Sequence, residues 1–275
     1  MSFQDRKKKG DFLGILIITF SFLLFISIGA FILINDSKKI KIDKNTFCPK
    51  TGPESKTVAI VDFTDPLNKA QKEFFLKELE KLKNNIKKYH GLIIYFVDEN
   101  TDLNKSKIFS ICNPGTKKDI KTAFEAISID PKKVEETWEK GFSDKISENI
   151  TDVIKSSKPQ STSPVMEMFQ LVSLREFKDY EKDTNKLIIL SDMIQNTSTL
   201  SMYKGEVPDF NNFRKTDYFS KVRTNLNKNV NVHLFIIKRD GFRKMQESKK
   251  FQSFWSDFFY TGNKSKDIRI SYVDG

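Results

Sequence analysis

Histidine and cysteine are scarce in this chain of 275 residues, and each occurs only twice. His90 lies near the predicted end of a helix, and His233 lies inside an apolar segment that is typical of a strand. Neither sits in an H-E-x-x-H motif or a recognisable Ser-His-Asp arrangement. We therefore expect no enzymatic activity, and we expect a core or surface role for both residues.

Arginine is also scarce, because most of the 47 basic residues are lysines spread among aspartate and glutamate. The formal net charge of +11 could attract nucleic acid or anionic envelope polymers. However, the sequence contains no arginine cluster, no zinc-finger spacing and no aromatic motif of the kind that binds RNA. Nucleic acid is therefore not an expected partner.

One long hydrophobic segment stands out from this otherwise polar chain. Residues 12–34 carry no charge, and at 1.5 Å per residue they would span about 35 Å, enough for the core of a bilayer. Cleaved secretory signals have shorter apolar cores of about 7–15 residues and end in small residues. We therefore predict an uncleaved signal anchor, with a cytoplasmic tail at 1–11 and a transmembrane helix at 12–35.

Basic residues flank this segment on both sides, so charge alone does not decide its orientation. Cys48 and Cys112 both follow the segment, as expected for a disulfide formed in an oxidising compartment. Two buried free thiols are the alternative. The sequence predicts a single-pass protein of the cell inner membrane whose C-terminal domain lies in the periplasm or another extracytoplasmic space.

Residues 36–56 are polar and contain Pro49, Gly52 and Pro53, which predicts a tether, and a globular domain is expected at 57–275. Within that domain, apolar runs that predict strands alternate with segments of helical periodicity. The predicted strands are 57–63, 92–97, 107–112, 185–192, 230–237 and 267–273. The alternation predicts an α/β fold with a doubly wound, mostly parallel sheet. Strand 107–112 is expected to form an antiparallel edge, because no crossover helix fits before it.

Acidic and hydroxyl residues follow the predicted central strands. Asp62 and Thr64 follow the first strand, Asp192 ends a later one, and Ser163 lies in the loop before a predicted helix. This order resembles the von Willebrand factor A (vWA) domain, whose metal-ion-dependent adhesion site combines a D-x-S-x-S motif, a loop threonine and a later aspartate. The resemblance implies that Asp62, Thr64, Ser163 and Asp192 are candidate ligands of Mg²⁺, which prefers oxygen donors.

The motif is kept only in part. Pro66 stands where the second serine belongs, and Met193 replaces the usual glycine after the last aspartate. Asp65 is a candidate substitute ligand for the missing serine. In the alternative interpretation no metal binds, and Asp62, Asp192 and Ser163 instead satisfy backbone N–H groups at the starts of helices.

The resemblance implies a membrane-anchored, extracytoplasmic vWA-like module that binds another protein, with Mg²⁺ as a candidate bridge. The setting would be a bacterial envelope or a mobile-element-associated system. The main alternative is a scaffold protein of the envelope with a non-functional metal site. A third interpretation, an aspartate-dependent phosphatase, lacks its general acid because Thr64 occupies that position.

Overall fold

The computed structural model describes residues 3–37, 40–97, 99, 107–156, 158–178, 180, 184–204, 206–226, 229–261 and 267–274. The chain divides into two compact units, Met1–Ile42 and Asp43–Gly275. The first unit contains helix α1 (Phe3–Ser37), which includes the apolar run of residues 12–34. No helix in the described part of the chain combines the length and the apolar character that a membrane crossing needs.

The second unit is built on a six-stranded sheet with the order β3-β2-β1-β4-β5-β6. Every neighbouring pair is parallel except β2 and β3, which are antiparallel. This confirms the predicted doubly wound, mostly parallel sheet with one antiparallel edge strand. The strands are β1 (Lys56–Val61), β2 (Gly91–Phe96), β3 (Lys107–Cys112), β4 (Asn185–Ser191), β5 (Val230–Ile237) and β6 (Ile268–Val273).

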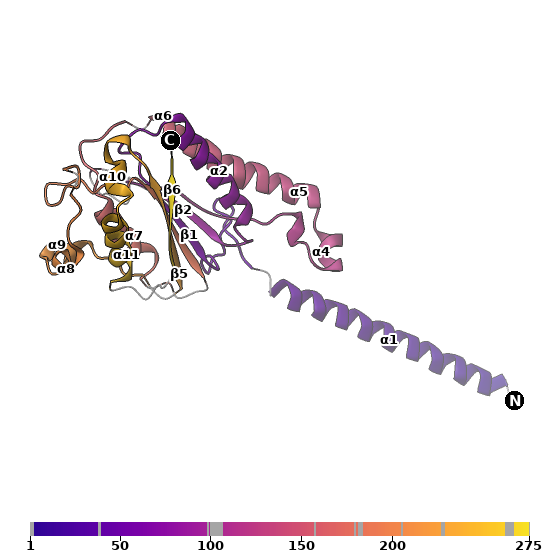
Figure 1. The fold of residues 1–275 in the computed structure, drawn as a ribbon. Helices are drawn as coiled ribbons and strands as arrows, with labels where there is room; N and C mark the ends of the chain where they lie inside the picture. Colours follow the sequence, from indigo (N-terminus) through magenta and orange to yellow (C-terminus); the bar gives the residue numbers. More distant parts are fainter. Residues whose placement is uncertain are drawn as a thin grey trace. The chain divides into compact units, whose positions relative to one another are not determined.

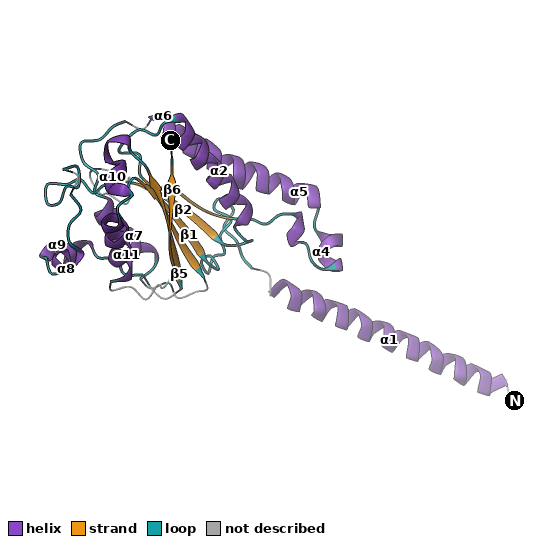
Figure 2. Ribbon diagram, viewed as in Figure 1, coloured by secondary structure: helices purple, strands orange, loops and turns teal. Residues whose placement is uncertain are grey.

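Helices cover both faces of this sheet (Figures 1 and 2). One side carries α2 (Lys69–Asn85), α4 (Ala123–Ser128), α5 (Pro131–Glu136) and α6 (Lys145–Ser156). The other side carries α7 (Val165–Glu176), α8 (Phe210–Phe213), α9 (Asp217–Val222), α10 (Arg243–Gln246) and α11 (Lys249–Tyr260). Two short 3-10 turns, η1 (Lys117–Asp119) and η3 (Asp240–Phe242), lie in the connections. α8 and α9 are separate helices, because Thr216 caps a new helix at Asp217.

The hydrophobic core lies in two layers, one on each side of the sheet. Alternate residues of β1 enter different layers: Val58 and Ile60 pack on the side of α7 and α11, and Ala59 and Val61 pack on the side of α2. Five aromatic residues of α11 are buried in the core layer on that side of the sheet. They are Phe251, Phe254, Trp255, Phe258 and Phe259.

Residues 131–156 form one continuous helical stretch that is not regular. Between α5 and α6 lies a π-helical segment, η2 (Thr137–Asp144), and Gly141 lies within it. The ring of Phe47 sits so close that a Cβ atom at position 141 would be 2.8 Å from Phe47 Cζ. Glycine is therefore required for this approach, which packs the segment before β1 against the helical layer.

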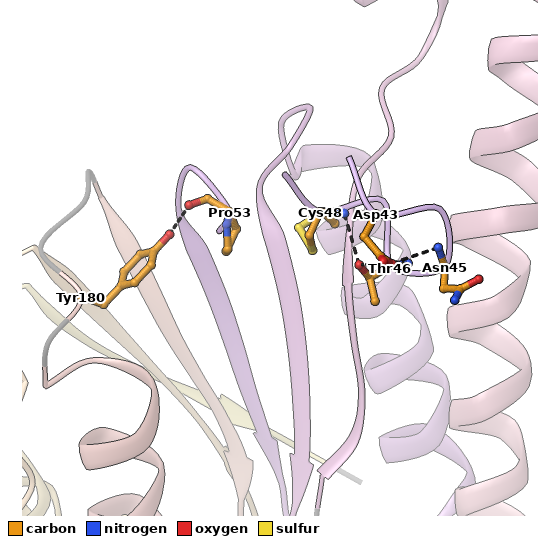
Figure 3. Close-up of a disulfide and its surroundings, with 7 residues drawn as sticks. Asp43, Asn45, Thr46, Cys48, Pro53 and Tyr180 are labelled. Carbon is orange, nitrogen blue, oxygen red and sulfur yellow. Dashed lines mark hydrogen bonds between the residues drawn. A yellow bond between two sulfur atoms is a disulfide. The ribbon is translucent and has the colours of Figure 1, made fainter. Parts of the chain in front are cut away.

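The predicted disulfide is confirmed, because the half-buried Cys48 is joined to the buried Cys112. The backbone N–H of Cys112 also donates to the carbonyl of Thr46 at 2.8 Å. Asp43 closes a turn beside this bond by accepting from the backbone N–H groups of Asn45 and Thr46 (Figure 3). The segment that enters the domain is thus fixed to the last residue of edge strand β3.

A second set of contacts holds the rest of this segment. The hydroxyl of Tyr180 donates to the carbonyl of Pro53 (Figure 3), and the N–H of Gly91 donates to the carbonyl of Ser55 at 2.8 Å. The compact unit accordingly begins at Asp43, earlier than the expected boundary at residue 57. The sequence between Asp43 and Ser55 is polar like a linker, yet backbone hydrogen bonds and the disulfide attach it to the sheet.

Candidate functional site

Four predicted site residues come together at the carboxyl ends of β1 and β4. Asp62 follows β1 directly, and its Oδ1 accepts from the hydroxyl of Thr64 at 2.6 Å. The hydroxyl of Ser163 donates to Asp62 Oδ2 at 3.3 Å and lies 3.1 Å from Thr64 Oγ1. Asp192 follows β4, the neighbour of β1 in the sheet. The structure therefore places these four residues at one rim of the sheet.

Ser191, which the sequence analysis did not single out, completes the environment of Asp62. Its hydroxyl donates to Asp62 Oδ2 at 2.7 Å and accepts from the N–H of Met193 at 2.8 Å. Asp62 also accepts from the backbone N–H of Thr64 at 3.0 Å. In the sequence, the position of Ser191 directly before the strand-end Asp192 was the signal that could have pointed to it. The carboxylate of Asp62 is consequently surrounded by donors from three segments of the chain.

Arg239, also missed from the sequence, binds the second carboxylate. It follows β5 closely, and its Nε donates to Asp192 Oδ2 at 3.1 Å. Its two terminal nitrogens reach the loop after β1: Nη1 donates to the carbonyl of Pro66 at 2.7 Å, and Nη2 donates to the carbonyl of Asp65 at 3.0 Å. One guanidinium therefore joins the loops that follow β1 and β4.

The four predicted residues are almost completely buried, with exposed fractions of 2–3%. Burial and the nearby Asp62 carboxylate raise the pKa of Asp192, while the charge of Arg239 acts in the opposite direction. The other oxygen of Asp192 accepts from the backbone N–H of Ile194 at 2.9 Å. These side chains form the floor of the rim and do not reach solvent.

The exposed part of the rim lies above this network. Asp65 does not turn toward Asp62. Instead, its carboxylate accepts from the hydroxyl of Tyr203 at 2.6 Å, and the Tyr203 ring packs edge-on against Phe242 with centroids 5.1 Å apart. Burial and the bond to Asp65 raise the pKa of Tyr203, which keeps its hydroxyl protonated as a donor. Tyr203 remains 38% exposed, and Pro66 is also exposed.

The expectation of helix caps needs correction. Asp62 and Asp192 do accept from backbone N–H groups two residues further along, within tight turns. However, α2 is capped by Asn68, and Pro164 at the start of α7 offers no side-chain cap. Gln195 instead accepts from the backbone N–H of Met166 in the first turn of α7, at 3.0 Å. Ser163 therefore does not serve as a cap and directs its hydroxyl to Asp62.

Comparison with protein-family models finds no match, and neither does comparison with curated proteins. Solved structures do match. One is the crystal structure of an aerotolerance-related membrane protein from Bacteroides fragilis NCTC 9343 with multiple mutations to serines. It is 10% identical, with a TM-score of 0.35, and the match covers 80% of this chain and 91% of that one. The mostly parallel sheet described above fits a vWA-like fold.

The residues at the rim supply the oxygen chemistry that Mg²⁺ prefers, but their arrangement does not fit the ion. Each oxygen of Asp62 and Asp192 already accepts from a protein donor. Arg239 places a positive charge against Asp192. Among the described residues, no group of three or more His, Cys, Asp or Glu side chains could hold a metal.

Proposed function

We propose that this chain is an envelope protein in which a vWA-like domain binds another protein and α1 anchors that domain to the inner membrane. The observation that carries the binding role is the rim at the ends of β1 and β4. There a buried polar network supports a surface made of the exposed residues Pro66 and Tyr203 and the half-buried Asp65. In open α/β sheets, this edge is where ligands generally bind.

The membrane anchor is proposed from the sequence of residues 12–34. Between Leu16 and Ile34, large apolar side chains of α1 are exposed, and a helical segment that is apolar on all sides is stable only when something covers it. They include Phe20, Phe22, Phe25, Phe31 and Leu33, each 59–73% exposed. The disulfide supports an extracytoplasmic position for the domain, because such bonds persist in oxidising compartments.

Tyr203 is the proposed anchor residue for the protein partner. Tyrosine is enriched at binding hot spots, because a large ring with a polar tip gives contact area at low entropic cost. Here the hydroxyl is held by Asp65 and the ring by Phe242, so the side chain is already ordered before binding. We propose no catalytic role and no nucleic-acid partner for this surface.

The test compares partner capture by the full chain, extracted from membranes in detergent with crosslinking. Tyr203→Ala is expected to lose a partner that the wild type captures. Tyr260→Ala is the matched control, because Tyr260 is similarly exposed but ends α11, which leads into the opposite edge of the sheet. Equal capture by the wild type and both variants would contradict the assignment of the rim.

Membrane attachment is tested separately by fractionation. The full chain is expected in the membrane fraction after a high-salt wash, and replacing Leu23 and Phe25 by aspartate is expected to release it. If the wild type is washed off by salt, the anchor is disproved while the rim assignment stands. Alanine variants at Asp62 or Asp192 are unsuitable for either test, because both residues are buried and hydrogen-bonded, so such changes would damage the fold.

The second candidate is a scaffold protein of the envelope whose rim no longer binds metal. It is favoured by the burial of the four metal-site positions and by the contact between Arg239 and Asp192. A scaffold would use other surfaces, so its assemblies would survive Tyr203→Ala. The same capture experiment therefore separates the two functions.

A further inference from the structure

We propose that the guanidinium of Arg239 is the resident cation of this rim and takes the role that a divalent ion has in the metal-ion-dependent adhesion site. The rim would then be complete without metal. This inference concerns the cation alone and does not depend on the partner-binding role proposed above.

The first support is the pattern of contacts that Arg239 makes. Its three nitrogen donors meet three oxygen acceptors: the carboxylate of Asp192 and the carbonyls of Asp65 and Pro66. The resemblance to the adhesion site implies an ion that joins the loop after the first strand to the aspartate after the fourth. Arg239 joins the same two segments with a rigid, permanently charged fork.

The second support is the position of the departure from the metal-binding motif. Pro66 stands where the motif has a serine ligand, and proline has no side-chain oxygen to offer a metal. Its backbone carbonyl nevertheless accepts from Arg239 Nη1 at 2.7 Å. Pro66 thus removes a side-chain metal ligand from the motif and at the same time supplies a backbone acceptor to the guanidinium of Arg239.

The third support is a buried frame that positions Arg239. The side chain of Gln246 is fully buried, and its Oε1 accepts from the backbone N–H of Arg239 at 2.8 Å. Its Nε2 donates to the carbonyls of Asp192, at 2.9 Å, and Ile237, at 2.8 Å. One amide thus fixes the backbone of the cation and the backbone of its carboxylate partner relative to each other.

Electrostatics gives the fourth support. Burial and the carboxylate of Asp62 both raise the pKa of Asp192, so a charged Asp192 requires positive charge or strong donors beside it. The hydroxyls of Thr64 and Ser191 donate hydrogen bonds to the carboxylate of Asp62, and the guanidinium of Arg239 supplies a positive charge at Asp192. A Mg²⁺ ion would have to displace these donors and sit beside a fixed cation, which is unfavourable in a site shielded from water.

The test measures binding of Mn²⁺, used as a probe for divalent cations, to the full chain in detergent micelles by electron paramagnetic resonance. Thermal unfolding in millimolar Mg²⁺ and in EDTA is measured in parallel. The wild type is expected to bind no Mn²⁺ at the rim and to unfold at the same temperature in both buffers. Arg239→Gln, which removes the charge but keeps a hydrogen-bonding group, is expected to bind one Mn²⁺ per chain.

Arg243→Gln is the matched control, because Arg243 is an exposed arginine nearby that pairs with Asp274. This control is expected to behave as the wild type. Stoichiometric Mn²⁺ binding by the wild type that disappears in Asp192→Asn would overturn the proposal. A folded Arg239→Gln protein that takes up no cation would also overturn it, since Arg239 would then not be standing in for a metal. The wild-type measurement alone remains decisive if Arg239→Gln does not fold.

Discussion

Replacing Arg239 by methionine tests how much the rim depends on its internal cation. The Asp192 side chain is 3% exposed and that of Arg239 is 17% exposed, so the pair is shielded from solvent. Removing one partner of a buried ion pair costs about 3–5 kcal/mol, because the other charge is left without compensation. We expect Arg239→Met to fall at the lower end of that range, since the freed carbonyl of the exposed Pro66 can bind water.

The pH dependence of this loss follows from Asp192. Burial and Asp62 already raise the pKa of Asp192, and loss of the arginine raises it further. An acid with a raised pKa in the folded state destabilises the protein as the pH rises through that pKa. The penalty of Arg239→Met is therefore expected to be larger at about pH 8 than at about pH 6.

The assay is urea unfolding of the full chain in detergent, followed by circular dichroism. Adding Asp192→Asn to Arg239→Met should recover about 1–3 kcal/mol, because no uncompensated carboxylate remains. Arg243→Met is the control, since this exposed arginine pairs with Asp274 and should cost about 0–1 kcal/mol. Equal losses in Arg239→Met and Arg243→Met would refute the reasoning.

Three further predictions follow. Replacing Cys48 and Cys112 by serine should lower the free energy of unfolding by about 4 kcal/mol, because the disulfide closes a loop with a sequence separation of 64. Urea titrations without reductant measure this loss, and an unchanged free energy would contradict the prediction. Burial lowers the pKa of His233, so the stability of the folded state should fall as the pH drops below about 6.5. In thermal melts over this pH range, His233→Gln should show a smaller fall than the wild type. The same pH profile in both proteins would contradict this assignment to His233. Gly141→Ala should destabilise the wild type, because the new Cβ would clash with the ring of Phe47. In a Phe47→Ala background it should be stabilising, because alanine favours helix over glycine. Denaturation midpoints measure both effects, and a change of the same sign in both backgrounds would exclude the contact.

The strands were predictable because the apolar residues of each buried strand are adjacent in the sequence. Buried parallel strands need near-continuous apolar runs, and all six runs form strands of the sheet. The antiparallel edge followed from the short connection before Lys107. Asp62 and Asp192 could be placed on one rim because the carboxyl ends of parallel strands share an edge, as β1 and β4 do.

The remainder of the site depends on contacts distant in sequence. Arg239 meets Asp65 and Pro66 across more than 170 residues, and Gln246 acts through backbone atoms that carry no sequence signal. No local pattern distinguishes this arginine from the others in the chain. The contacts of the segment from Asp43 depend on distant residues for a related reason, because a polar sequence does not show which carbonyls a distant strand will use.

The disulfide also determines how tension would travel through the molecule. Tension applied along the chain from its N-terminal side reaches Cys48 and can pass through the sulfur bridge directly to Cys112. Strands β1 and β2 and helix α2 lie within the covalent loop and are bypassed. The turn at Asp62 is inside that loop as well. Tension on the N-terminal segment would therefore not be transmitted along the chain through the part of the rim that follows β1.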